Sequence, residues 1–232
     1  MTTTDQRQGR DCTLAELLGA CETPVEYPPI DYAAKGAEYL RDALRRSAIA
    51  RFEFWASENP VIADTDWNRP QFDANRQAIE RVRNWQCATK GLLLTGLTGR
   101  GKTRSLASLY SRLSHEGVDV RWWHSRDLFS TLQSHLRFGC DEAQGWVEAV
   151  AGHRVLIIDD FGQEAVTDSR KEWASQHFMR LLDIRVNKGL PLMLSTNLTA
   201  QDMANSAGDG PRIRSDPLIR RLLDLCDVEK FG

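Results

Sequence analysis

One short stretch of the sequence combines the residue types and the spacing needed to hold a chain of phosphate groups. It is Gly96-Leu97-Thr98-Gly99-Arg100-Gly101-Lys102-Thr103, which fits the pattern G-x-x-x-x-G-K-[ST] and follows the apolar run 92–94. Glycine lacks a Cβ atom, so backbone N–H groups here can approach phosphate oxygens closely. The lysine would reach the β- and γ-phosphates, and the threonine hydroxyl would bind Mg²⁺. We therefore predict that these residues, with Arg104 after them, bind ATP and Mg²⁺; the alternative is a glycine-rich turn without a ligand.

Two carboxylates follow directly after a second apolar run, Val155-Leu156-Ile157-Ile158. This pattern predicts a buried strand with acids at its carboxyl end, where open α/β sheets bind ligands. We expect Asp159 to hold Mg²⁺ and Asp160 to orient or deprotonate the attacking water. Many hydrolysing proteins with this loop carry Glu at the second position. Because Asp is one methylene shorter, we expect slow turnover; Glu164 is either a helper or a surface charge.

Two later stretches offer groups that could act on the γ-phosphate. Asn197 follows the apolar run 192–194 and could hydrogen-bond the γ-phosphate or the attacking water, although an Asn after a strand is often a turn residue. An arginine of the stretch 216–223, which contains Arg220 and Arg221, could reach the γ-phosphate of a neighbouring subunit as an arginine finger. The alternative for these arginines is the charged face of a surface helix.

Short apolar runs and helical patterns alternate along most of the chain. The runs lie at 91–95, 118–123, 155–159 and 190–195, which predicts an α/β fold with a parallel sheet covered on both faces. We assign residues 71–232 to this nucleotide-binding domain. Residues 1–70 are predicted to form a small helical region and a linker that bind a partner, with one helix over about 32–56. The arginines of that helix form either a solvated face paired with Glu38, Asp42 and Glu53 or a docking face.

Composition excludes several other classes of protein. Of the 232 residues, 41% are hydrophobic and 27% are charged, as in ordinary globular proteins. The formal net charge is −2, so any contact with nucleic acid must come from a local basic patch. The five cysteines and five histidines are scattered without the spacing of a metal site. No apolar run approaches the about 20 residues of a membrane span. We therefore expect a cytoplasmic protein that does not contact a membrane.

With these motifs in order, residues 72–227 resemble the AAA+ ATPases of the DnaC/IstB group, which comprises helicase loaders and transposition helper ATPases. The resemblance rests on the segments GLTGRGKT, VRWWHSRDLFSTL, VLIIDDFGQE, LMLSTNL and IRRLL. It implies a P-loop NTPase fold of the ASCE type with five parallel strands. The strand before the loop 96–103 (the P-loop strand) would lie between the strand that ends before Asn197 and the strand that ends in Asp159 and Asp160 (the Asp-Asp strand). It also implies ATP hydrolysis involving Lys102, Asp160, Asn197 and Arg221, with Mg²⁺ on Thr103 and Asp159.

The resemblance implies three partners: a hexameric replicative helicase, single-stranded DNA, and further copies of this chain joined through ATP and Arg221. Arg220, beside Arg221, is the other candidate for the finger. Single-stranded DNA could contact the region around 121–138, and our candidates are Arg121, His124, Arg126, Arg137 and Phe138. Trp122 and Trp123 could stack on bases. Because consecutive strand residues face opposite ways, we expect at least one of them in the core.

One part of the family pattern is predicted to be missing or truncated. Family members continue past the finger into a strand and a further arginine, but no arginine follows Arg221 in this sequence. Arg212 or Arg214 could supply that contact instead.

Four functions remain open at this point. The first is a helicase loader, and the second is a transposition helper that targets a transposase to DNA. A nucleotide-binding adaptor without significant hydrolysis is the third. The fourth is a small-molecule kinase whose lid contains the arginines Arg212, Arg214, Arg220 and Arg221.

Overall fold

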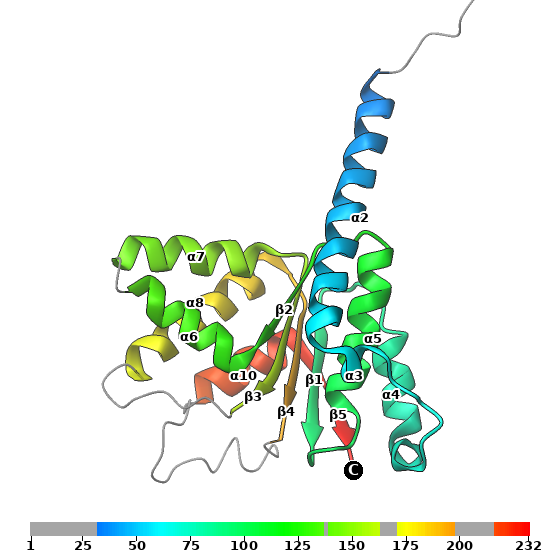
Figure 1. Ribbon diagram of the computed structural model, residues 1–232. Coiled ribbons are helices and arrows are strands. Elements are labelled where there is room, and N and C mark those ends of the chain that lie inside the picture. Colours follow the sequence, from blue (N-terminus) through cyan, green and yellow to red (C-terminus); the bar gives the residue numbers. More distant parts are fainter. Residues whose placement is uncertain (1–31, 137–138, 163–170, 198–215) are drawn as a thin grey trace, which may run out of the picture. The chain divides into compact units, whose positions relative to one another are not determined.

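Five parallel strands form one sheet in the computed structural model, which describes residues 32–136, 139–162, 171–197 and 216–232 (Figure 1). The strands are β1 (Gly91–Gly96), β2 (Val120–His124), β3 (Val155–Phe161), β4 (Leu192–Thr196) and β5 (Cys226–Phe231), in the order β2-β3-β4-β1-β5. The chain divides into two units, Met1–Glu38 and Tyr39–Gly232, and the whole sheet belongs to the second. This confirms the predicted five-stranded parallel α/β fold.

The strand order corrects one expectation that came from the resemblance. The P-loop strand β1 lies between β4 and β5, and the Asp-Asp strand β3 lies on the other side of β4. The side chains of β3 therefore reach the P-loop across the end of β4. For this reason the polar end of β4 occupies the centre of the candidate site.

Strand β5 lies where the family pattern places a strand after Arg221, whereas the absence of the further arginine's contact stays a prediction. The strand pairs with β1 along its whole length, from Gly91 opposite Cys226 to Gly96 opposite Phe231. No apolar run indicates this strand in the sequence, because charged residues interrupt it. Its exposed positions carry Asp227 and Lys230, so the apolar run that marked the other strands is absent.

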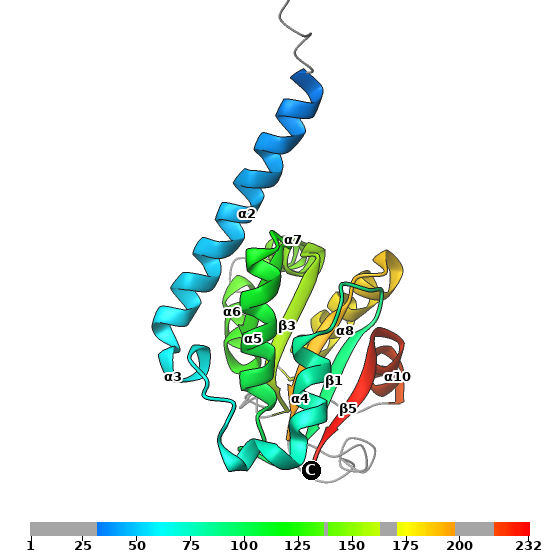
Figure 2. The ribbon, with the colours of Figure 1, turned by 90° about the vertical axis from the view of Figure 1, so that its right-hand side faces the viewer.

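Helices cover both faces of the sheet (Figure 2). On one face lie η1 (Pro70–Asn75), α4 (Arg76–Arg83) and α5 (Lys102–His115). On the other lie α6 (Ser125–Leu136), α7 (Cys140–Gly152), α8 (Lys171–Lys188) and α10 (Asp216–Leu225). Consecutive strand residues feed the two cores in turn, since Leu92 and Leu94 belong to the first cluster and Leu93 to the second. Both faces are buried, which explains the continuous apolar runs.

Helix α2 spans Tyr32–Glu58, close to the predicted range. In its second half Ala48 is buried, and the Phe52 ring lies 5.2 Å from the Tyr110 ring of α5. Arg51 forms an ion pair with Asp119 at 2.8 Å, rather than with the acids of its own helix. The predicted linker contains a short helix, α3 (Pro60–Ala63), which contacts α5. Among the helices that the structure describes, none has the length and apolar character that crossing a bilayer requires.

Candidate nucleotide-binding site

The predicted phosphate-binding loop connects β1 to α5, and its backbone needs glycine at both ends. Gly96 has a φ of 133°, and a Cβ atom there would lie 1.9 Å from the carbonyl oxygen of Phe231. Gly101 has a φ of 101° and occupies the N-cap position of α5. These conformations are accessible to glycine and strained for other residues. The loop therefore ends at the amino end of a helix, where N–H groups and the helix dipole favour phosphate.

Lys102 is buried at the start of α5, with 6% of its surface exposed. Its ammonium group donates to the carbonyl oxygens of Gly96 at 2.6 Å and Leu97 at 2.8 Å, and to Oδ1 of Asn197 at 2.9 Å. Burial lowers the pKa of Lys102, and the nearby Asp160 and Asp159 oppose that shift. The lysine thus sits inside the loop with hydrogen bonds that phosphate oxygens could replace.

Thr103 and Asp159 meet across the site. The Thr103 hydroxyl donates to Oδ1 of Asp159 at 3.0 Å, and the Ser195 hydroxyl donates to the same oxygen at 2.5 Å. Burial raises the pKa of the Asp159 carboxyl, whereas these two hydrogen bonds lower it. A hydroxyl and a carboxylate are hard oxygen ligands that suit Mg²⁺. Since no cluster of three or more His, Cys, Asp or Glu occurs within the described ranges, Mg²⁺ here would also need phosphate oxygens and water.

Strand β3 contains a β-bulge at Asp159 and Asp160. Ile158 pairs with Leu194 and Phe161 with Thr196, so two residues of β3 lie opposite one residue of β4. Asp160 has a φ of 59° and, within the described part of the chain, is the only non-glycine residue with a positive φ. Such a conformation costs about 1–3 kcal/mol and is often found at functional sites. The bulge turns the Asp160 carboxylate toward Asn197, which hydrogen-bonds it.

Asn197 connects the lysine to the second acid. Its amide nitrogen donates to Oδ1 of Asp160 at 3.0 Å, while its amide oxygen accepts from Lys102. His124, at the end of β2, places Nε2 3.8 Å from Oδ2 of Asp160. Asn197 thus hydrogen-bonds both Lys102 and Asp160, the two other residues for which a role in hydrolysis is predicted.

These side chains line a cavity of about 510 Å³ at the carboxyl ends of the strands. Its lining comprises Ile62, Gln71, Thr98, Gly99, Gly101, Lys102, Thr103, Arg104, His124, Asp159, Asp160, Ser195 and Asn197. Most of the predicted cofactor-binding residues are among them. The exceptions are Gly96, Leu97 and Arg100, of which Leu97 is 64% exposed.

Four residues of this cavity are not predicted from the sequence to line it, namely Ile62, Gln71, His124 and Ser195. The sequence suggests His124 as a DNA contact and indicates no role for Ser195. Each of His124 and Ser195 is a polar residue at or near the carboxyl end of a predicted strand, and this position is a signal for a site residue. The residues that each of them contacts follow only from the register between the strands. In the register, His124 pairs with Asp159, and Ser195 lies beside the bulge.

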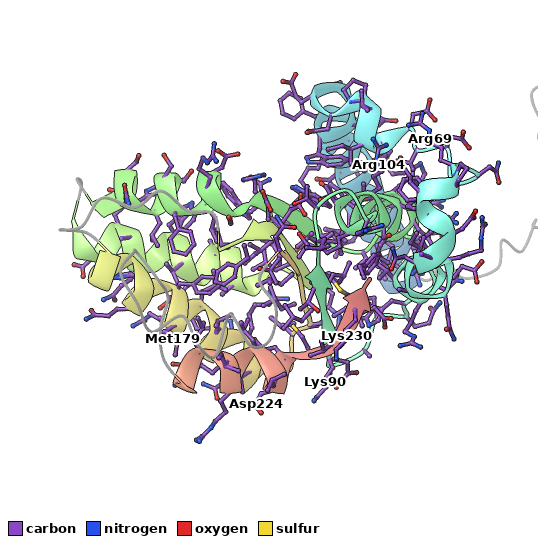
Figure 3. All side chains as sticks on the ribbon, turned by 90° about the horizontal axis from the view of Figure 1, so that it is seen from below. Arg69, Lys90, Arg104, Met179, Asp224 and Lys230 are labelled. Carbon is purple, nitrogen blue, oxygen red and sulfur yellow. The ribbon has the colours of Figure 1, made fainter. Side chains whose placement is uncertain are left out.

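Other predicted residues lie elsewhere. Arg221 forms an ion pair with Asp183 of α8 and does not line the cavity, whereas Arg220 is exposed. Figure 3 shows Asp224 of α10 on the opposite side of the sheet from Arg104. Trp122 and Trp123 pack into opposite cores, against Trp55 and Trp146 respectively. Arg137, Phe138, Glu164, Arg212 and Arg214 lie outside the described residues.

Ser195 is expected to hold both acids in place, and Ser195→Ala tests this. Its hydroxyl donates to Asp159 and accepts the backbone N–H of Asp160 at 2.9 Å in a fully buried position. Without it the Asp160 N–H loses its partner, which costs about 1–3 kcal/mol. We expect urea denaturation to show that loss, together with weaker Mg²⁺-dependent ATP binding by calorimetry.

Ser114→Ala is the matched control for that measurement. Ser114 is equally buried, but its hydroxyl has no hydrogen-bond partner in the described part of the chain. Its removal should change stability little. Equal effects of the two substitutions would contradict the role given to Ser195.

Comparisons with known proteins identify a family and several solved structures of the same fold. The family model described as IstB-like ATP binding protein matches residues 38–231, and the chain therefore belongs to that family. This confirms the predicted membership in the DnaC/IstB group. A search of curated proteins finds no match to the chain.

Solved structures share the fold. The DnaC helicase loader is 21% identical with a TM-score of 0.54, over 71% of this chain and 92% of that chain. DnaI is 23% identical with a TM-score of 0.52, over 74% and 87%. A putative primosome component from Streptococcus pyogenes serotype M3 is 25% identical with a TM-score of 0.51, over 73% and 84%.

Proposed function

We propose that this protein binds ATP with Mg²⁺ and hydrolyses it slowly, using the cycle to load a replicative DNA helicase onto single-stranded DNA. The observation that carries the ATPase part is the convergence of Lys102, Thr103, Asp159, Asp160 and Asn197 on one cavity. An adaptor without hydrolysis would need only the first three of these residues. The hydrogen bond from Asn197 holds the carboxylate of Asp160 in the cavity, where it could accept a proton from a water molecule.

Some residues of the cavity would bind ATP and Mg²⁺, and others would take part in hydrolysis. Lys102 would exchange its carbonyl and amide partners for β- and γ-phosphate oxygens, since it is already directed into the loop. Thr103 and Asp159 would hold Mg²⁺, which neutralises charge on the phosphates when bound. Asp160 would accept a proton from the attacking water, and Asn197 would orient that water or the γ-phosphate. The short Asp160 side chain supports slow turnover.

The role in helicase loading is supported by the structural neighbours, which include a DnaC helicase loader and a putative primosome component. We propose that residues 1–70 bind the helicase and that self-association involves ATP with Arg221 or Arg220. Of the two, Arg221 is held by Asp183, so it would have to leave that ion pair to reach a neighbouring subunit.

A second candidate, a helper ATPase that targets a transposase to DNA, is favoured by the family model itself. The matching model is that of IstB-like ATP binding proteins, and it covers residues 38–231. The two roles use the same ATPase site and differ in the protein partner.

Affinity capture from the native host separates the two roles. The full-length chain, saturated with a non-hydrolysable ATP analogue, serves as bait, and Lys102→Ala serves as the matched control. Recovery of a replicative helicase with the wild-type bait alone supports helicase loading. Recovery of a transposase instead would overturn that role in favour of the second.

A further inference from the structure

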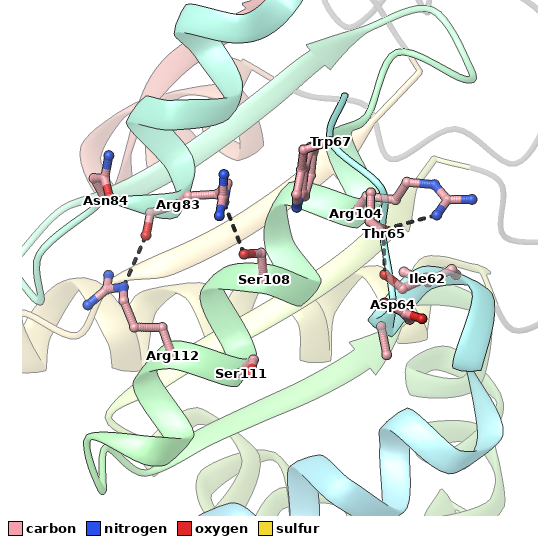
Figure 4. A pocket seen from close by; sticks show the side chains of 11 residues that line it. Ile62, Asp64, Thr65, Trp67, Arg83, Asn84, Arg104, Ser108, Ser111 and Arg112 are labelled. Carbon is pink, nitrogen blue, oxygen red and sulfur yellow. Dashed lines mark hydrogen bonds between the residues drawn. The ribbon is translucent and has the colours of Figure 1, made fainter. Parts of the chain in front are cut away.

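A second pocket, separate from the phosphate-binding loop, lies on the outer side of α5 (Figure 4). It has a volume of about 370 Å³ and is bounded by α5, the end of α4, the end of α3 and the segment that follows α3. Three arginines line it, Arg83, Arg104 and Arg112, and Asp64 is the only acid in the lining. This is a local basic site in a chain whose formal net charge is −2.

Neighbouring groups hold two of these arginines with only part of their hydrogen-bonding capacity used. Arg83 donates from Nε to the Ser108 hydroxyl at 3.2 Å, and its guanidinium lies 5.1 Å from the Trp67 ring centroid. Arg104 donates from Nη1 to the Val61 carbonyl at 2.5 Å and to Thr65 at 3.0 Å. Among the described residues, both Nη atoms of Arg83 and Nη2 of Arg104 have no hydrogen-bond partner. They are therefore oriented and still able to donate.

Arg112 has a different part in the pocket. It donates to the carbonyl oxygens of Arg83 and Trp85 and forms an ion pair with Glu116 at 2.6 Å. These bonds connect α5 to the end of α4 and fix the position of Arg83. Arg112 thus builds the pocket, whereas Arg83 and Arg104 supply its donors.

We propose that this pocket binds phosphate groups, and that its ligand is the phosphodiester backbone of a nucleic acid strand. Guanidinium groups bind phosphate through paired N–H donors, and serine hydroxyls such as that of Ser111 can add a further donor. Because the Arg83 guanidinium lies over the Trp67 ring, a nucleic acid base could not stack on that face of the ring. Binding would therefore be independent of sequence. This inference does not depend on ATP hydrolysis.

Arg104 connects this pocket to the nucleotide cavity. It directly follows Thr103 in α5, and it lines both cavities together with Ile62. A strand bound at Arg104 would contact the same helical turn that begins with Lys102 and Thr103. The geometry therefore places a nucleic acid contact directly behind the candidate ATP site.

The test measures binding of a fluorescein-labelled oligo-dT strand of about 20 nucleotides by anisotropy, over a range of salt concentrations. Arg83→Gln is expected to weaken binding by about tenfold and to lower the salt slope by about one. Ser111→Glu, which places a carboxylate in the pocket without removing a packed side chain, is expected to weaken it at least as much. Arg180→Gln is the matched control, because Arg180 is exposed on α8 and pairs with Glu148.

A second probe, inorganic tripolyphosphate, distinguishes the source of the phosphate. It is measured by calorimetry in a Lys102→Ala background, so that the phosphate-binding loop does not contribute. If strand binding falls in the two pocket variants and not in Arg180→Gln, the proposal is supported with nucleic acid as ligand. If only tripolyphosphate binding falls, the phosphate site is supported, and its ligand is a free polyphosphate. Unchanged binding of both probes overturns the proposal.

Discussion

Lys102→Ala is expected to weaken ATP binding by about 10- to 150-fold, because a hydrogen bond to a charged group contributes about 1.5–3 kcal/mol. Hydrolysis should fall further, by about 10²- to 10³-fold, since the lysine would also meet charge that develops on the transferred phosphoryl group. The structure supports a large effect because the ammonium group is buried inside the loop and makes three hydrogen bonds there. Calorimetry with ATP and a phosphate-release assay measure the two effects.

Lys230→Ala is the control for that substitution. Lys230 is an exposed lysine of the edge strand β5, in the same sheet as the loop (Figure 3). Its removal should leave ATP affinity within about twofold, as for most surface substitutions. Thermal unfolding of both variants checks that the loop substitution has not unfolded the domain. A Lys102→Ala protein that binds ATP as tightly as the wild type would contradict the assignment of the loop.

Three of the strands predicted from the sequence, β1, β3 and β4, are buried on both faces. Residues 92–94, 156–158 and 192–194 are each at most 5% exposed, so every position had to be apolar and the runs were continuous. Strand β5 has only some of its residues buried and carries charges at its exposed positions, as an edge strand does. Apolar runs therefore mark the three inner strands. The edge strand β2 is marked as well, by Val120 and its two tryptophans, whereas β5 is not.

The loop and the two acids were likewise predictable, because each is a local motif whose chemistry follows from residue type and spacing. The positions of Ser195 and His124 were not, because both depend on the register between strands about 35 residues apart. The bulge at Asp160 determines which side chains contact one another in the site, and no local sequence pattern predicts this bulge. Conformations of this kind are set by the surrounding structure.

Arg185 illustrates the same limit in the core. In a helical pattern it is indistinguishable from a solvated arginine, yet it is fully buried and donates to the carbonyl oxygens of Ala151, His153 and Pro191. Burial lowers its pKa to about 10, so it remains charged at neutral pH. Its role is to satisfy the backbone where α7 ends and β4 begins, which only the assembled fold reveals.

Asp160→Asn is expected to lower ATP turnover by about 10²-fold or more while leaving ATP affinity within a few-fold, since a positioned general base contributes about 10²–10⁴-fold. Asparagine suits this test because it tolerates the positive φ of residue 160 and retains an oxygen that accepts from Asn197. The substitution therefore removes the negative charge and the basicity with little change in geometry. Single-turnover phosphate release and ATP calorimetry give the two quantities.

Two further variants make that result interpretable. Asp127→Asn removes an exposed carboxylate from the neighbouring helix α6 and should leave turnover unchanged. Asp160→Glu lengthens the side chain by one methylene, at the cost of a less favourable residue for a positive φ, and should keep or raise turnover if a short reach limits the wild-type rate. If Asp160→Asn hydrolyses ATP at the wild-type rate, the carboxylate is not the base. If the wild type itself releases no phosphate above the Lys102→Ala background, the strained bulge serves nucleotide binding alone and the adaptor function takes the place of the ATPase.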